Sequence, residues 1–478
     1  MNKYTYATIE ELKKALANKE TTPENLVQHA LERAEKLKDL NAVLETFDKK
    51  SILENSSLQG RLAGIPGYIK DNICQKDRLL TCGSNILKGF RSTYDATAIA
   101  RLKEEGALLL GRTNLDEFAM GSSGETSAFG KTKNPWNLEC VPGGSSSGSG
   151  AAVAAGLASW ALGSETGGSV RLPAAMCGLV GMKVTYGLIS RYGLVAYGSS
   201  LDSIGVFSRT VYDNALVVSV LGGHDEKDSS SLKTEPKDYT KSLTGELKKG
   251  LRIGVVKDAI DAPGIHPEVR QATLDALKLL EDQGAVLQPI SIKALQYCAA
   301  SYFIISRAEA ASNLARFDGV RYGARVPGKN LLEMYENTRC AGFGPEVKSR
   351  IILGNYVLSV GHSREFYESA QRVRSLIRKE MQDAFNTVDL LVMPTHSVPA
   401  FKTGAYDNNK LEMDLQDYFT APVNLAGVPA ISLPVGFTSD GKPLGMQLIG
   451  PHLSEELIFQ TAHAYQQKTD WHTRTPQL

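Results

Sequence analysis

Two short runs that combine serine with glycine lie about one helix length apart in this sequence. The first, GGSSSGSG, covers residues 143–150, and the second, ETGGS, covers residues 165–169. Glycines beside a serine let the backbone turn sharply and point several N–H groups at one place, as a developing oxyanion requires. Between them, the apolar run 151–162 predicts a buried helix with small faces that holds both runs rigidly. The pattern indicates a serine nucleophile, whereas a flexible linker would have polar flanks.

A serine nucleophile needs a base, and the candidate is Lys70. Ser169 ends the second run, and a free serine must lose its proton to a positioned group. None of the eight histidines lies within residues 66–223, although a distant histidine could fold back onto the site. Lys70 lies in residues 68–73, which follow a Pro-Gly turn and read as a strand. Burial there would lower its pKa and leave a neutral amine near pH 7. The alternative is a surface lysine that pairs with Asp71.

Together, these residues resemble the catalytic signature of the amidase signature family, whose Ser-Ser-Lys triad has the same types, order and spacing. Lys70 lies 75 residues before Ser145, which lies 24 residues before Ser169. The resemblance implies that Ser169 is the nucleophile, that Ser145 follows a cis peptide bond and bridges the other two, and that Lys70 is the base. It also implies hydrolysis or transfer at a carboxamide through an acyl-enzyme. The implied oxyanion hole consists of the backbone N–H groups of Thr166, Gly167, Gly168 and Ser169.

Within that family, the resemblance to the glutaminase subunits of tRNA-dependent amidotransferases extends over nearly the whole chain. It implies that glutamine is the substrate and that its ammonia passes through a tunnel to a partner subunit. The partner would use ATP and Mg²⁺ to amidate Glu or Asp misacylated on tRNA(Gln) or tRNA(Asn). The implied assembly is a heterotrimer with the B and C subunits of such an enzyme, in which the partner handles the tRNA and this chain holds no cofactor. The similar segments are residues 111–130, 134–149, 190–205, 313–323, 346–354 and 417–436.

A free amino acid as substrate would need a guanidinium for its α-carboxylate and a carboxylate for its α-ammonium. Arg350 and Asp417 match the positions with these roles in the glutaminase subunits, and Tyr302 matches a third contact. A guanidinium can bind a carboxylate through two parallel hydrogen bonds, which a lysine cannot do. One alternative is that Arg350 pairs with Glu346, four residues earlier on a helix. The other is that Asp417 caps a helix or lies on the surface.

Four positions depart from the motif of these subunits, and none of them removes a triad atom. Leu172 bears most on the substrate, because other amidases place apolar residues there to receive apolar substrates. The departures are Glu165 where Asp is usual, Leu172 for Gln, Val184 for Pro and Leu188 for Arg.

Three hypotheses about function follow from these residues. The first is a glutamine-hydrolysing subunit of an amidotransferase. The second is a stand-alone amidase for small or fatty amides, which would have no use for Arg350 and Asp417 because such substrates carry no α-carboxylate or α-ammonium. The third is a non-catalytic subunit that kept the fold, which the retention of Lys70, Ser145 and Ser169 disfavours.

The composition limits the partners and the cellular location. The 478 residues include 53 basic and 52 acidic side chains, a net charge of +1, whereas a chain that gripped tRNA alone would show a basic surplus. No apolar window is long enough to span a bilayer, and the first residues lack the apolar core of a signal peptide. These features predict a cytoplasmic or organelle-matrix protein without membrane contact. Six scattered cysteines without CxxC pairs predict reduced thiols and no metal site. The sequence contains no phosphate-binding loop of the Walker type, so we expect no ATP use by this chain.

The elements that must hold these residues alternate between helix and strand. A capping box of Thr8 and Glu11 opens the first helix, and residues 22–37 predict a second. Residues 95–110 and 252–292 each contain a helix, a glycine stop and a following strand. Alternation predicts an α/β protein with a largely buried sheet.

The resemblance implies the amidase signature fold, a mixed central sheet flanked by helices on both faces. We expect a single domain over residues 1–478, with a catalytic core at about 60–210. The polar stretch 224–250 is the predicted surface loop between an N-terminal catalytic half and a C-terminal half.

Overall fold

The computed structural model describes residues 2–54 and 58–478 and arranges them around one mixed sheet of eleven strands. The strand order is β1-β3-β2-β4-β6-β5-β10-β11-β9-β7-β8. The pairs β2–β3, β2–β4, β7–β8 and β7–β9 are parallel, and the other neighbours are antiparallel. The predicted α/β class with a mixed sheet is therefore confirmed. The strands are β1 Val43–Thr46, β2 Pro66–Lys70, β3 Leu108–Thr113, β4 Trp160–Glu165, β5 Val180–Lys183, β6 Ser203–Ser208, β7 Arg252–Val256, β8 Val286–Ile290, β9 Leu390–Pro394, β10 Ala430–Phe437 and β11 Pro443–Ile449.

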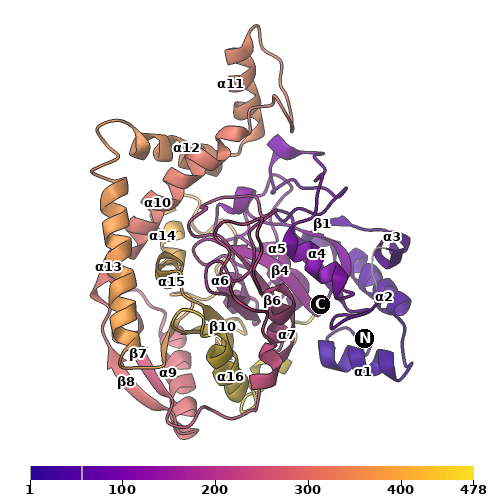
Figure 1. Ribbon diagram of the computed structural model, residues 1–478, viewed down its shortest axis with the longest axis vertical. Helices are drawn as coiled ribbons and strands as arrows, with labels where there is room; N and C mark the ends of the chain where they lie inside the picture. Colours follow the sequence, from indigo (N-terminus) through magenta and orange to yellow (C-terminus); the bar gives the residue numbers. More distant parts are fainter. Residues whose placement is uncertain (1, 55–57) are drawn as a thin grey trace.

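Helices surround this sheet, and α11 projects from the rest of the molecule at the top of Figure 1, whereas α12 packs against α10. The α-helices are α1 Ile9–Ala17, α2 Pro23–Lys36, α3 Lys49–Glu54, α4 Thr97–Glu104, α5 Ser147–Ala154, α6 Arg171–Met176, α7 Val211–Leu221, α8 Lys257–Ile260, α9 Pro267–Asp282, α10 Cys298–Asn313, α11 Leu331–Gly342, α12 Pro345–Leu358, α13 Tyr367–Phe385, α14 Lys410–Asp414, α15 Ala421–Ala426 and α16 Glu455–Gln466. Within the described residues, no helix is both long enough and apolar enough to cross a membrane.

Strand β11 shows that helices cover both faces of the sheet. Gln447 accepts a hydrogen bond from Arg171 of α6 on one face. Its neighbours Met446 and Leu448 belong to the apolar core that also contains side chains of α9 and α16. Successive side chains of a strand point to opposite faces. Helix α6 therefore packs on one face and α9 and α16 on the other, as the resemblance implied.

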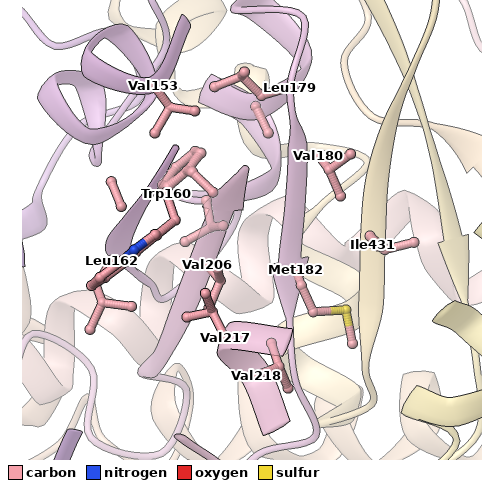
Figure 2. Packing of buried hydrophobic residues seen from close by; sticks show 14 of the residues in the cluster. Val153, Trp160, Leu162, Leu179, Val180, Met182, Val206, Val217, Val218 and Ile431 are labelled. Carbon is pink, nitrogen blue, oxygen red and sulfur yellow. The ribbon is translucent and has the colours of Figure 1, made fainter. Parts of the chain in front are cut away.

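The two serine-containing runs are joined by a buried helix and a buried strand, so the single helix predicted over 151–162 is wrong. Helix α5 ends at Ala154, and Gly156 follows with φ +68°, a conformation that suits glycine and ends a helix. The chain then enters β4 at Trp160, which packs against Gly67 of β2. Figure 2 shows Trp160 and Leu162 among the buried side chains of this layer. The segment is still rigid, because every residue of α5 and β4 is buried.

Other sequence predictions agree with the structure. The capping box of Thr8 and Glu11 is present, and α2 fills the segment 22–37. The segments 95–110 and 252–292 each contain the predicted helix, a glycine at positive φ and the predicted strand. These are α4 and β3 in the first segment and α9 and β8 in the second. The segment 224–250 is mainly loop, with one short 3₁₀ turn whose Tyr239 is buried against Phe459. The predicted strand at 68–73 is β2, which begins two residues earlier and ends at Lys70.

Candidate active site

Lys70 is the last residue of β2, and its amine lies fully buried beside the first serine run. The Nζ atom is 2.8 Å from Ser145 Oγ, 2.8 Å from Ser146 Oγ and 3.2 Å from the carbonyl oxygen of Ser164. The neighbouring Asp71 accepts from Arg112 instead, at 3.2 Å. A surface lysine paired with Asp71 is therefore excluded.

The surroundings of Lys70 favour an amine without its proton. Burial lowers the pKa of Lys70 to about 7, although the charges of Asp116 and Asp202 act in the opposite direction. Desolvation penalises the ammonium form because the low-polarity interior solvates a charge poorly. A substantial fraction of the amine is thus neutral near pH 7 and can accept a proton from a hydroxyl in contact with it.

The two serine runs meet at the backbone. The Gly144–Ser145 peptide bond is cis, as the resemblance implied. The N–H of Ser146 donates to the carbonyl oxygen of Ser169 at 3.2 Å. The Ser169 hydroxyl forms no hydrogen bond with any described residue, and catalytic hydrogen bonds often tighten only when substrate binds. The bridge from Ser145 to Ser169 stays a prediction.

The turn after β4 leaves backbone N–H groups free beside Ser169. Glu165 Oε2 accepts from the N–H groups of Val170 and Arg171, both at 3.0 Å, and Oε1 accepts from Arg171 Nε at 2.9 Å. In the described part of the chain, no group accepts from the N–H groups of Gly167, Gly168 and Ser169. This arrangement suits the predicted oxyanion hole, and the longer Glu165 braces the turn through its carboxylate.

Tyr302 and Asp417 lie against the same turn. A Cβ atom at Gly167 would collide with the Tyr302 hydroxyl, and one at Gly168 would lie 2.9 Å from Asp417 Oδ1. Both contacts are possible only because these two positions are glycines. The structure thus brings two of the predicted substrate-binding side chains to the predicted oxyanion hole.

Asp417 is buried, so the alternative of a surface acid is wrong, and its side chain caps none of the described helices. Its Oδ2 accepts from Ser122 Oγ at 3.0 Å, whereas Oδ1 is buried without a hydrogen-bond partner among the described residues. Burial raises the pKa of Asp417 to about 7, while the hydrogen bond from Ser122 and the charge of Arg350 lower it. A buried carboxylate oxygen without a donor is costly unless a ligand supplies one. An ammonium group of a substrate would do so.

Arg350 is buried on α12 and forms an ion pair with Glu346. The sequence predicts this pair as the alternative to a substrate-binding role. Its Nε lies 2.6 Å from Glu346 Oε1, and its Nη1 donates to the Tyr197 hydroxyl. The remaining Nη2 forms no hydrogen bond within the described residues. The charges of Arg350 and Asp417 both act on the pKa of Tyr302, which burial raises. All three predicted substrate residues therefore share one neighbourhood, and the pair with Glu346 does not occupy the whole guanidinium.

The departures from the family motif are accommodated inside the protein. Leu172 is fully buried in a small apolar cluster with Cys140, Val141, Met176 and Ala400. Its side chain packs against protein, and this position gives no support for an apolar substrate. Val184 and Leu188 are also buried, in the main core.

Four polar residues of the site were not singled out from the sequence. They are Ser146 on Lys70, Ser122 on Asp417, Tyr197 on Arg350, and Asp202, which accepts from Thr166 Oγ1 at 2.6 Å and from the N–H groups of Tyr197 and Gly198 at 2.9 and 3.1 Å. Ser146 lies in the first serine run, and the other three lie in the segments 111–130 and 190–205 that carry the family resemblance. Their position in those segments was the sequence feature that could have identified them as residues of the site.

This fold and this site place the chain in a known family. The sequence profile of the amidase family matches residues 25–459, and the chain belongs to this family. It is 49% identical to the A subunit of glutamyl-tRNA(Gln) amidotransferase from Cyanothece sp., with 99% of this chain and 100% of the relative covered. The corresponding protein of Halalkalibacterium halodurans is also 49% identical, with 97% of each chain covered.

Solved structures agree with this assignment. The crystal structure of the glutamyl-tRNA(Gln) amidotransferase A subunit from Thermotoga maritima superposes with a TM-score of 0.83 at 39% identity, covering 98% of this chain and 96% of that one. The 6-aminohexanoate cyclic dimer hydrolase has a TM-score of 0.86 at 27% identity, with 99% of each chain covered. The fold is therefore shared between an amidotransferase subunit and a hydrolase, and the choice between such functions depends on the site.

Proposed function

We propose that this chain is the glutamine-hydrolysing subunit of a tRNA-dependent amidotransferase. The observation that carries the proposal is that Asp417 lies against the turn that holds Ser169, while the buried Arg350 is near enough for its charge to act on the pKa of Asp417. A guanidinium and a carboxylate in one neighbourhood suit the α-carboxylate and α-ammonium of a free amino acid. The near-full-length similarity to the A subunits of glutamyl-tRNA(Gln) amidotransferases favours the same function. A simple or fatty amide offers neither charged group.

In the proposed mechanism, Ser169 Oγ attacks the side-chain carbonyl carbon of glutamine. Its proton passes to Ser145, whose own proton passes to the neutral amine of Lys70. The carbonyl oxygen becomes an oxyanion, which the free N–H groups of Gly167 and Gly168 stabilise. The lysine then returns its proton through Ser145 to the departing nitrogen, and ammonia leaves. Water hydrolyses the acyl-enzyme by the same proton path in reverse, which releases glutamate.

The partners follow from the same proposal. Ammonia would pass to a B-type subunit, which holds ATP and Mg²⁺ and amidates the misacylated tRNA, and a C-type subunit would complete the heterotrimer. This chain then needs no cofactor of its own. Its net charge of +1 supports an arrangement in which the partner handles most of the tRNA. A location in the cytoplasm or an organelle matrix fits this role.

Removing either charged substrate contact should damage glutamine hydrolysis selectively. Arg350→Ala or Asp417→Ala should lower kcat/KM for glutamine about 10- to 100-fold, because each removes a charge-assisted hydrogen bond worth about 1.5–3 kcal/mol. Ammonia release from butyramide, which has no α-substituents, should hardly change. The Lys348→Ala variant on the same helix is the matched control and should behave like the parent on both substrates. Equal losses on both amides would indicate a folding role for these residues. No loss on either would favour a stand-alone amidase.

The two groups with pKa values of about 7 predict different pH profiles for the two kinds of substrate. Lys70 must be neutral to accept a proton, and Asp417 must be ionised to bind an ammonium. Falling pH removes both active forms, so log(kcat/KM) for glutamine should drop below pH 7 with a slope approaching two. Butyramide needs only the neutral Lys70, and its slope should approach one. In Asp417→Asn the glutamine slope should also approach one. The same slope for both substrates in the parent would contradict these roles.

A further inference from the structure

A cavity of about 700 Å³ lies where the C-terminal half of α13 meets the residues that follow α15. Figure 1 shows α13 standing beside α15 on the left of the molecule. One face of α13 supplies Arg374, Arg378 and Gln382, which are four residues apart and therefore lie above one another. Tyr186 and His452 line the cavity from other segments. No Asp or Glu is found among the described residues that line it.

The two arginines of this cavity lack a full set of partners. Arg374 donates from Nε to the carbonyl oxygen of Leu425 at 3.0 Å, and its Nη1 and Nη2 donate to Ser200 Oγ and O at 2.7 and 2.8 Å. These bonds use three of its five N–H groups. Arg378 forms no hydrogen bond or ion pair with any residue that the structure describes. Like charges one turn apart repel each other. Burial and the charge of Arg378 both lower the pKa of Arg374, although Glu309 raises it.

Glu309 does not neutralise this pair from within the cavity. It lies on α10, outside the lining, and its oxygens accept from the N–H and the hydroxyl of Ser200 at 2.9 and 2.6 Å. An anion in the cavity would meet Arg378 and the free N–H groups of Arg374. A phosphate group fits best, because guanidinium forks bind its oxygens in pairs. The volume is that of a small-molecule site.

The cavity is connected to the active site by the segment 197–202. Ser200 of this segment receives the two hydrogen bonds from Arg374. At one end of the segment, the Tyr197 hydroxyl accepts from Arg350. At the other end, Asp202 accepts from Thr166 Oγ1 in the predicted oxyanion turn. One short segment thus contacts the cavity, the substrate-binding arginine and the turn beside the nucleophile.

We propose that this cavity is an effector site for a small phosphate-bearing molecule, whose binding between Arg374 and Arg378 raises the rate of glutamine hydrolysis. A bound phosphate reduces the repulsion between the charges of the two arginines and thereby strengthens the hydrogen bonds from Arg374 to Ser200. The segment 197–202 then keeps Arg350 and Thr166 in their working positions more of the time. An enzyme that releases ammonia for use elsewhere gains from such control, because hydrolysis without an acceptor wastes glutamine. The effector role rests on the proposed glutaminase function, whereas phosphate binding does not.

The test measures binding and activity on the full chain at constant ionic strength. Calorimetric titration with inorganic phosphate and with adenosine monophosphate, each against a chloride control, should show saturable binding. Arg378→Gln should weaken that binding at least tenfold. Because it also removes the repulsion between the two arginines, its rate without phosphate should be equal to or higher than that of the parent. Saturating phosphate or nucleotide should raise kcat/KM for glutamine about fivefold or more in the parent, and this increase should vanish in Arg378→Gln. The matched control Arg372→Gln, on the same helix but outside the cavity and exposed, should keep both binding and activation.

The outcomes distinguish a nucleotide from free phosphate as the ligand. They also distinguish failure of the effector site from failure of the proposed glutaminase function. Binding of the nucleotide at least tenfold tighter than phosphate would identify a nucleotide, and equal binding would identify free phosphate. The effector site is overturned if neither probe binds, if Arg378→Gln binds like the parent, or if binding leaves glutamine hydrolysis unchanged. Binding of a short RNA but of neither small probe would also overturn it, in favour of a nucleic-acid contact. Phosphate binding by a chain that hydrolyses butyramide but not glutamine would refute the proposed function alone.

Discussion

Ser169→Ala should lower amide hydrolysis by at least about 10⁴-fold while leaving the fold intact. The nucleophile forms the covalent bond of the acyl-enzyme, and no neighbouring group replaces it, because residual activity in such variants comes only from substrate binding and the oxyanion hole. The Ser169 hydroxyl is also free of hydrogen bonds to the described residues, so its removal leaves no buried polar partner unsatisfied. Ammonia release from glutamine and butyramide, together with the thermal unfolding midpoint Tm, would measure both effects.

Ser149→Ala is the matched control for this substitution. Ser149 belongs to the first serine run and is fully buried, but its hydroxyl contacts Thr113 Oγ1 and donates to the carbonyl oxygen of Leu162. Its loss should lower stability by about 1 kcal/mol, the usual value of such a bond, and should preserve most of the activity. Full hydrolysis by pure, folded Ser169→Ala, or equal inactivation by the two variants, would show that Ser169 is not the nucleophile.

The parts of the site that could be predicted are those encoded by residue type and spacing along the chain. Serine-glycine runs at 143–150 and 165–169 identify the turns, and Lys70 lies within a strand signal that places it in the interior. The structure supports that placement, since Lys70 and Ser145 are in contact. Arg350 and Asp417 were found only through similarity, because nothing in their local sequence distinguishes a ligand contact from an ordinary helix pair or cap.

The boundary between α5 and β4 could not be predicted from hydrophobic periodicity. A helix or strand that is buried on all sides carries apolar or small residues at every position, so neither the helical nor the strand period is visible. Residues 147–165 are buried except for the partly exposed Ser159, which explains the loss of the signal. Gly156, with its positive φ, was the one local indication that the helix ends.

The polar contacts that position the substrate residues join distant parts of the chain. Ser122 and Asp417 are separated by 295 positions, and Tyr197 and Arg350 by 153. The folded sheet brings the two members of each pair together from distant parts of the chain. Local sequence patterns carry no information about them, whereas family resemblance marks the segments without saying which side chains meet.

Lys70→Arg and Lys70→Met should both lower kcat/KM about 10³-fold, within the usual range of 10²–10⁴ for loss of a general base. The guanidinium of arginine keeps its proton at any working pH and cannot accept one from Ser145. Methionine fills a similar volume without a titratable group. Steady-state ammonia release would measure both variants. Retention of most activity by Lys70→Arg would show that the residue is a structural charge.

The stability of Lys70→Met tests the buried amine independently of catalysis. Folding lowers the pKa of Lys70 from its ordinary 10.5 to about 7, so the folded state holds its proton less well than the unfolded state. This difference penalises folding below pH 10.5, increasingly as the pH falls to about 7, and by a constant amount below that. The methionine variant avoids the penalty. Its Tm relative to the parent should therefore be highest at pH 7 or below and should decline as the pH approaches 10. A difference in Tm that does not change over this range would show that the amine is not held in its neutral form by burial.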